Sequence, residues 1–92
     1  MQDYSDWTLF LDRDGVINQR IPDAYINHWD DFRFARGAEK ALKKLRGRFA
    51  RLIIVTNQQG IAKRIMTEIQ LERLHQKMCE VLNAQGIHVD AI

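Results

Sequence analysis

Two short apolar runs, each ending abruptly in polar residues, dominate the hydrophobic pattern of the chain. Residues 7–11 and 51–55 are mostly aliphatic, aromatic or β-branched, and neither run alternates with polar positions. Continuous runs of this length predict parallel strands that are buried on both faces. A segment with helical spacing separates the runs, and the order strand, helix, strand favours a right-handed crossover that leaves the strands parallel.

The spacing of apolar residues predicts two helices. The first covers residues 37–45 and ends at Gly47. The second begins after Thr67, because Gln70 completes a capping-box pattern with that residue, and it stops at Gly86. The apolar stripe of the second helix consists of Leu71, Leu74, Met78, Val81 and Leu82.

A third strand begins at residues 87–92, where the sequence ends. Residues 15–34 read as a loop with a short hairpin, rich enough in aromatic residues to cover the end of the first strand. The predicted fold class is therefore α/β, with a partial Rossmann-like core in which helices flank a parallel sheet.

The composition is that of a small globular protein. The 92 residues are 46% hydrophobic and 28% charged, and the net charge of +2 is too small to indicate nucleic-acid binding. No apolar run approaches the length of a membrane span, and residues 1–6 are unlike a signal peptide. The single cysteine, Cys79, excludes an internal disulfide and favours a reducing cytoplasm. We expect one domain over residues 1–92, with neither nucleic acid nor membrane as a partner.

Polar residues follow both apolar runs at equivalent places. Asp12 and Asp14 follow the first run, and Thr56 and Asn57 follow the second. A hairpin that turns at residues 13–15 is the alternative, since Asp-Gly is a common turn signal. A hairpin gives no reason for the second polar cluster, whereas parallel strands would bring both clusters to one edge of the sheet.

Asp12 and Asp14 suit phosphoryl transfer to a carboxylate. Two acids this close repel one another unless a cation or a shared proton is present, and Mg²⁺ prefers carboxylate and phosphate oxygens. One carboxylate can act as a nucleophile and the other as a general acid and base, while the Thr56 hydroxyl can hold phosphoryl oxygens.

His75 and Cys79 can share a helix face, but two ligands make no metal site, so we expect Cys79 to be a core residue.

The sequence around these residues resembles the haloacid dehalogenase (HAD) superfamily of aspartate-nucleophile phosphatases. The two strings that carry the resemblance are FLDRDGVIN at residues 10–18 and VTNQQGIA at residues 55–62. They are similar to the branch of subfamily III that acts on sugar bisphosphates and on histidinol phosphate. The resemblance implies a Mg²⁺-dependent phosphomonoesterase whose substrate is a small phosphorylated metabolite.

The resemblance also implies a role for each matching residue. Asp12 matches the nucleophile and would bind Mg²⁺ through its other oxygen, and Asp14 matches the general acid and base, with its backbone carbonyl on the metal. Thr56 and Asn57 match phosphate-binding residues. Lys63 matches a position that is often basic and faces the substrate.

Smaller contributions are implied for the neighbours of these residues. Arg13 and Gly15 would contribute mainly their backbone, and Asn18 and Gln58 would support the site locally. Arg64 stands where the family has glycine, which changes the expected geometry of that loop.

The family also has parts that would follow Ile92. These are a lysine, a distal metal-binding acid and, in this branch, a zinc-binding loop of cysteines and histidines. We therefore expect an N-terminal part of such a phosphatase, truncated at the start of the third strand and weakly active or inactive alone. The alternatives are a non-catalytic module that binds phosphate or Mg²⁺, an oligomer, and a fragment complemented by a C-terminal part. The order of the acids disfavours a receiver-like domain.

Overall fold

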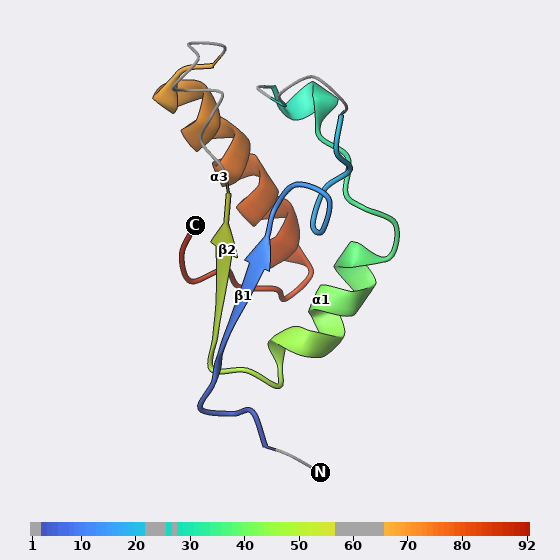
Figure 1. Ribbon diagram of the computed structural model, residues 1–92, viewed down its shortest axis with the longest axis vertical. Helices are drawn as coiled ribbons and strands as arrows, with labels where there is room; N and C mark the ends of the chain where they lie inside the picture. The colour runs from blue at the N-terminus through green and yellow to red at the C-terminus, as the bar shows by residue number, and fades with distance from the viewer. Residues whose placement is uncertain (1–2, 22–25, 27, 57–65) are drawn as a thin grey trace.

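Two parallel strands and two helices form the framework of the chain (Figure 1). The computed structural model describes residues 3–21, 26, 28–56 and 66–92. Its elements in chain order are β1 (Thr8–Asp12), a 3₁₀-helix η1 (Trp29–Asp31), α1 (Ala38–Arg46), β2 (Arg51–Val55) and α3 (Glu68–Ala84). The predicted α/β class is confirmed.

The sheet is parallel, as the sequence predicts. The register runs from Thr8 opposite Arg51 to Asp12 opposite Val55, so the carboxyl ends of β1 and β2 lie side by side. Because β1 pairs with β2 and not with the residues that follow it, the alternative of a hairpin at residues 13–15 is excluded.

Residues 87–91 run along the other edge of β2. The Asp90 N–H donates to the Leu52 carbonyl at 2.9 Å, and the Ile54 N–H donates to the Ala91 carbonyl at 3.0 Å. The Asp90 carboxylate also accepts from the Leu52 N–H at 2.8 Å and pairs with Arg46 at 3.2 Å. Within the described chain the predicted third strand is thus a single parallel bridge, between Ile53 and Ala91.

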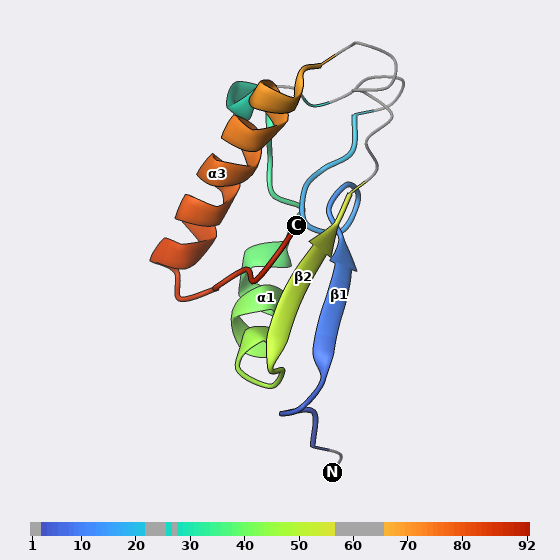
Figure 2. The same ribbon diagram turned by 90° about the vertical axis from the view of Figure 1, so that its left-hand side faces the viewer.

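Both helices lie on the same face of the sheet (Figure 2). Leu52 and Ile54 point toward that face and are each 1% exposed, whereas Phe10 and Val55 on the opposite face are 61% and 47% exposed. The prediction that both strands are buried on two faces is therefore wrong for the described chain. A continuous apolar run makes both faces of a strand apolar, but it does not determine whether an element covers each of them.

The core fills the space between the sheet and the helices. Its most deeply buried apolar residues are Ile17, Leu52, Ile54, Leu74, Met78, Leu82 and Ile87. Cys79 packs against this cluster, as expected for a core residue, and burial raises the pKa of its thiol.

The beginning of α3 follows the predicted capping box. The Gln70 N–H donates to Thr67 Oγ1 at 3.1 Å, and the Thr67 N–H donates to Gln70 Oε1 at 2.8 Å. These two bonds satisfy donors that the first turn of a helix otherwise leaves open. None of the helices in the described part of the chain has both the length and the apolar character needed to cross a bilayer.

The segment between β1 and α1 contains the expected short antiparallel contact. The Gln19 N–H donates to the Arg33 carbonyl at 2.7 Å, and the Ala35 N–H donates to the Ile17 carbonyl at 2.8 Å. Three aromatic rings in and just before the second arm of this contact stack or meet edge-on, those of Trp29, Phe32 and Phe34. This packing holds the turn after β1 against the core.

Candidate phosphoryl-transfer site

The carboxyl ends of β1 and β2 bring Asp12 and Thr56 to one edge of the sheet. Asp12 lies opposite Val55 in the register, and the N–H of the next residue, Arg13, donates to the Val55 carbonyl at 3.0 Å. Thr56 follows directly in the chain. Asp12 is exposed, and its carboxylate has no hydrogen bond or ion pair with the described residues.

A tight turn carries the chain away from β1. The Arg13 carbonyl accepts from the N–H groups of Ile17 at 2.8 Å and Asn18 at 3.1 Å, and the Gly15 N–H donates to the Asn18 carbonyl at 2.8 Å. Gly15 has a φ of 84°, a left-handed conformation in which a side chain is strained. The turn therefore fixes Asp14 two positions beyond the end of the strand.

The Asp14 carboxylate accepts three hydrogen bonds from its neighbours in the turn. Arg13 Nη2 donates to Oδ1 at 3.0 Å and to Oδ2 at 3.2 Å, and Asn18 Nδ2 donates to Oδ1 at 3.0 Å. Asn18 is fully buried, so its amide is held in place by the surrounding core. The orientation of the Asp14 carboxylate is thus determined by two side chains of the same turn.

The Arg13 side chain reaches further than the sequence indicates. It is 4% exposed, and its Nη1 lies 2.9 Å from Nε2 of His75 on α3. The expectation that Arg13 contributes mainly backbone is wrong, because its guanidinium joins Asp14 to a helix distant in the sequence. The spacing of the sequence relates His75 only to Cys79, four positions further on, and no local spacing links it to Arg13.

His75 is neutral in this arrangement. An arginine can only donate hydrogen bonds, so His75 Nε2 accepts and the proton of the ring lies on Nδ1. The pKa of His75 is lowered to about 4, chiefly by burial and further by the charge of Arg13, while the charge of Asp14 opposes the shift. The imidazole is therefore a stable acceptor at neutral pH.

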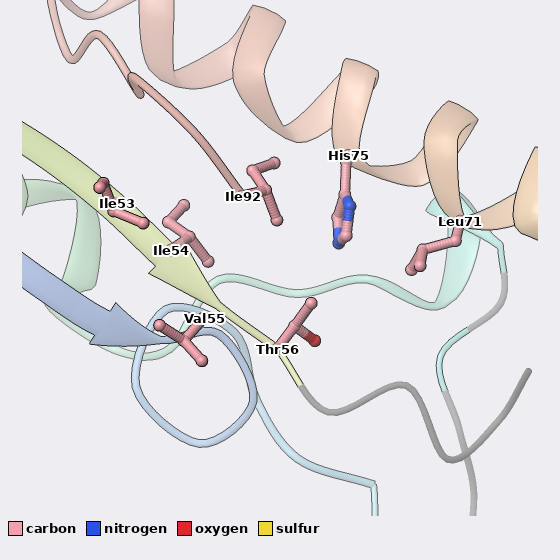
Figure 3. A pocket seen from close by; sticks show the side chains of 7 residues that line it. All are labelled: Ile53, Ile54, Val55, Thr56, Leu71, His75 and Ile92. Carbon is pink, nitrogen blue, oxygen red and sulfur yellow. The ribbon is translucent and has the colours of Figure 1, made fainter. Parts of the chain in front are cut away.

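An open pocket of about 410 Å³ lies beside this network, between the end of β2 and α3. Thr56 and His75 point into it from opposite sides (Figure 3). The other lining residues are apolar: Ile53, Ile54, Val55, Leu71 and Ile92. The pocket places a hydroxyl and an imidazole at the end of β2, which lies beside the end of β1 that carries Asp12.

The donor set at the end of β1 fits a hard divalent cation. The Asp12 carboxylate is exposed, and the Asp14 carbonyl accepts no backbone hydrogen bond from the described residues. Both are oxygen ligands of the kind that Mg²⁺ prefers. No cluster of three or more His, Cys, Asp or Glu side chains suitable for a metal occurs in the described part of the chain.

Several residues named from the sequence fall outside the described residues. These are Asn57, Gln58, Lys63 and Arg64. Their predicted contributions to phosphate or substrate binding stay predictions.

The fold is similar to that of HAD-like phosphatases. A D,D-heptose 1,7-bisphosphate phosphatase from B. bronchiseptica, solved with magnesium and phosphate, superposes with a TM-score of 0.84 at 34% identity, covering 92% of this chain and 47% of that chain. A candidate HAD-like phosphatase from Mesorhizobium loti superposes with a TM-score of 0.77 at 27% identity, covering 96% of this chain and 43% of that chain.

Curated relatives point to a particular branch of that class. D-glycero-α-D-manno-heptose-1,7-bisphosphate 7-phosphatase of Mycobacterium tuberculosis is 39% identical over 84 residues, which is 91% of this chain and 44% of the relative. D-glycero-β-D-manno-heptose-1,7-bisphosphate 7-phosphatase of Haemophilus ducreyi is 41% identical over 85 residues, which is 91% of this chain and 46% of the relative. No protein-family model matches the chain. The chain is thus related by sequence and fold to HAD-type phosphatases, and it spans about half the length of these relatives.

Proposed function

We propose that the chain carries the nucleophile half of a Mg²⁺-dependent phosphomonoesterase whose substrate is a phosphorylated sugar, in the first instance a heptose bisphosphate. The observation that carries the proposal is the exposed Asp12 carboxylate at the carboxyl end of β1, beside Thr56. Similarity to heptose bisphosphate phosphatases over 91% of the chain supports the choice of substrate class.

In the proposed reaction Asp12 attacks the phosphorus atom of the ester. A carboxylate oxygen of Asp12 forms a bond to phosphorus while the bond from phosphorus to the sugar oxygen breaks, giving an aspartyl phosphate and the free alcohol. The exposed position of Asp12 leaves room for a substrate to approach in line. When bound, Mg²⁺ would neutralise phosphoryl charge, with the Asp12 carboxylate and the Asp14 carbonyl as its ligands from this chain.

Asp14 moves the protons of both steps. In its protonated form it donates to the leaving sugar oxygen, and as a carboxylate it then accepts a proton from the water that attacks the aspartyl phosphate. The second step releases inorganic phosphate and restores Asp12. Thr56 at the end of β2 is the candidate to hold the phosphoryl oxygens, together with Asn57 and with Lys63 toward the substrate.

The test places these residues in the context of a whole relative. The chain alone, and a chimera in which it replaces the matched 84-residue segment of the M. tuberculosis relative, are assayed for phosphate release from heptose bisphosphate with Mg²⁺ and with EDTA. We expect Mg²⁺-dependent release by the chimera and a loss of at least about a hundredfold with Asp12→Asn. Asp31→Asn, at an exposed acid of η1, serves as the control. A folded chimera that releases no phosphate, or one that Asp12→Asn leaves unchanged, would exclude the proposal.

A further inference from the structure

We infer that His75 is a positioning residue, which fixes the orientation of the Asp14 carboxylate by holding the Arg13 guanidinium. The inference rests on the proposed function, because it concerns the residue assigned there as general acid and base. Three groups form an unbroken chain of contacts, from His75 Nε2 to Arg13 Nη1 at 2.9 Å and from Arg13 Nη2 to the two Asp14 oxygens at 3.0 and 3.2 Å.

The guanidinium transmits orientation because it is planar and rigid. Its N–H groups point in fixed directions, so fixing Nη1 against one partner determines where Nη2 lies. His75 belongs to α3, whereas Arg13 belongs to the turn after β1, and the two residues are 62 positions apart in the sequence. The contact therefore ties the turn that carries Asp14 to a helix whose position is set by the core.

Arg13 depends on His75 because it is buried. At 4% exposure its Nη1 cannot exchange a lost acceptor for bulk water, and its Nε already has no hydrogen-bond partner among the described residues. A second unpaired donor would favour a different rotamer of Arg13. Asp14 would then keep only its hydrogen bond from Asn18.

The contact between His75 and Arg13 requires one tautomer of the imidazole. Nε2 must be unprotonated to accept from Arg13, so the ring is neutral with its proton on Nδ1. Glutamine can replace this function, since its side-chain oxygen has about the same reach from Cα as Nε2. Leucine has a comparable volume but offers no acceptor, so His75→Gln and His75→Leu form a matched pair.

A structural experiment on the chain tests the contact directly. Nitrogen-15 NMR of the His75 ring at pH 7 should show the Nδ1–H tautomer, and three-bond couplings should show a single side-chain rotamer for Asp14. We expect rotamer averaging of Asp14 in His75→Leu and the single rotamer in His75→Gln. A wild-type ring that is protonated at pH 7, or carries its proton on Nε2, overturns the inference without requiring any variant to fold.

A kinetic experiment tests the consequence for catalysis. Loss of a positioned acid lowers the rate of hydrolysis far more for a sugar phosphate than for p-nitrophenyl phosphate. The sugar alkoxide is a poor leaving group unless it is protonated, whereas p-nitrophenolate needs little protonation. With Mg²⁺, His75→Leu should lower kcat on the sugar phosphate by about tenfold or more and on p-nitrophenyl phosphate by less than about twofold, and His75→Gln should restore both. Gln76→Ala, at the exposed neighbouring position on α3, should change neither rate.

The outcomes separate this inference from the proposed function. Equal losses on the two esters in His75→Leu indicate general damage and overturn the positioning role, as does the absence of any loss. A wild-type chain that hydrolyses neither ester counts against activity of this chain, and the Asp14 rotamers in the NMR experiment then decide alone whether His75 positions that carboxylate.

Discussion

At the scale of single residues, two acids that look equivalent in the sequence have different surroundings in the fold. Asp12 is exposed and has no described partner, whereas Asp14 accepts hydrogen bonds from a buried arginine and a buried asparagine. Different surroundings are how two carboxylates in one site take different parts in catalysis. The free carboxylate suits attack and metal binding, and the oriented one suits proton transfer.

His75 makes the stability of the chain depend on pH in the acid range. Its pKa is about 4 in the folded chain, against an ordinary value of 6.5, because burial and Arg13 disfavour the imidazolium. As the pH falls, His75 therefore binds a proton in the unfolded chain before it does so in the folded chain. The contribution of His75 to the free energy of unfolding is complete above pH 6.5 and is lost between pH 6.5 and 4. Since the ring is only partly buried, we expect this loss to be about 1–2 kcal/mol.

Urea unfolding of the wild type and of His75→Gln, measured between pH 7.5 and about 4, isolates this contribution. Carboxylates titrate alike in both proteins, so the difference between their unfolding free energies reports on His75. That difference should shift against the wild type as the pH falls. A difference that does not change with pH would contradict the lowered pKa of His75.

At the scale of elements, the sequence predicts what local interactions determine and misses what the tertiary fold brings together. The range 51–55 matches β2, and Thr67 and Gly86 bracket α3, because caps and apolar spacing act over a few residues. The edge shared by Asp12 and Thr56 also follows from parallel pairing. The Arg13–His75 contact has no such signal, because it depends on how α3 lies against the turn after β1.

The capping box of α3 gives a prediction at this scale. Thr67→Ala removes the acceptor of the Gln70 N–H and should lower the free energy of unfolding by about 1 kcal/mol, whereas Thr67→Ser should cost much less. Thermal or urea unfolding measures both variants, and helical circular dichroism reports on the first turn. A loss in Thr67→Ser equal to that in Thr67→Ala would show that the methyl group, and not the hydroxyl, stabilises this end.

At the scale of the whole molecule, the sheet is covered on one face only within the described chain. Leu52 and Ile54 are buried on the face that carries the helices, while Phe10 and Val55 are exposed on the other face. The relatives that share this fold are about twice as long as the chain. Stability of the isolated chain must therefore come from the face that carries α1 and α3.

Two substitutions on opposite sides of the sheet test that asymmetry. Leu74→Ala opens a cavity beneath α3 at a residue that is 1% exposed, and it should lower the free energy of unfolding by about 2–5 kcal/mol. Phe10→Thr replaces one residue type that favours strands with another, at a position that is 61% exposed, so it should change that free energy by about 0.5 kcal/mol or less. Urea unfolding at two protein concentrations, a hundredfold apart, makes the comparison. If a second copy buried this face, the effect of Phe10→Thr would grow with protein concentration. A small effect that is the same at both concentrations identifies this face as solvated in the isolated chain. A large effect contradicts a solvated face.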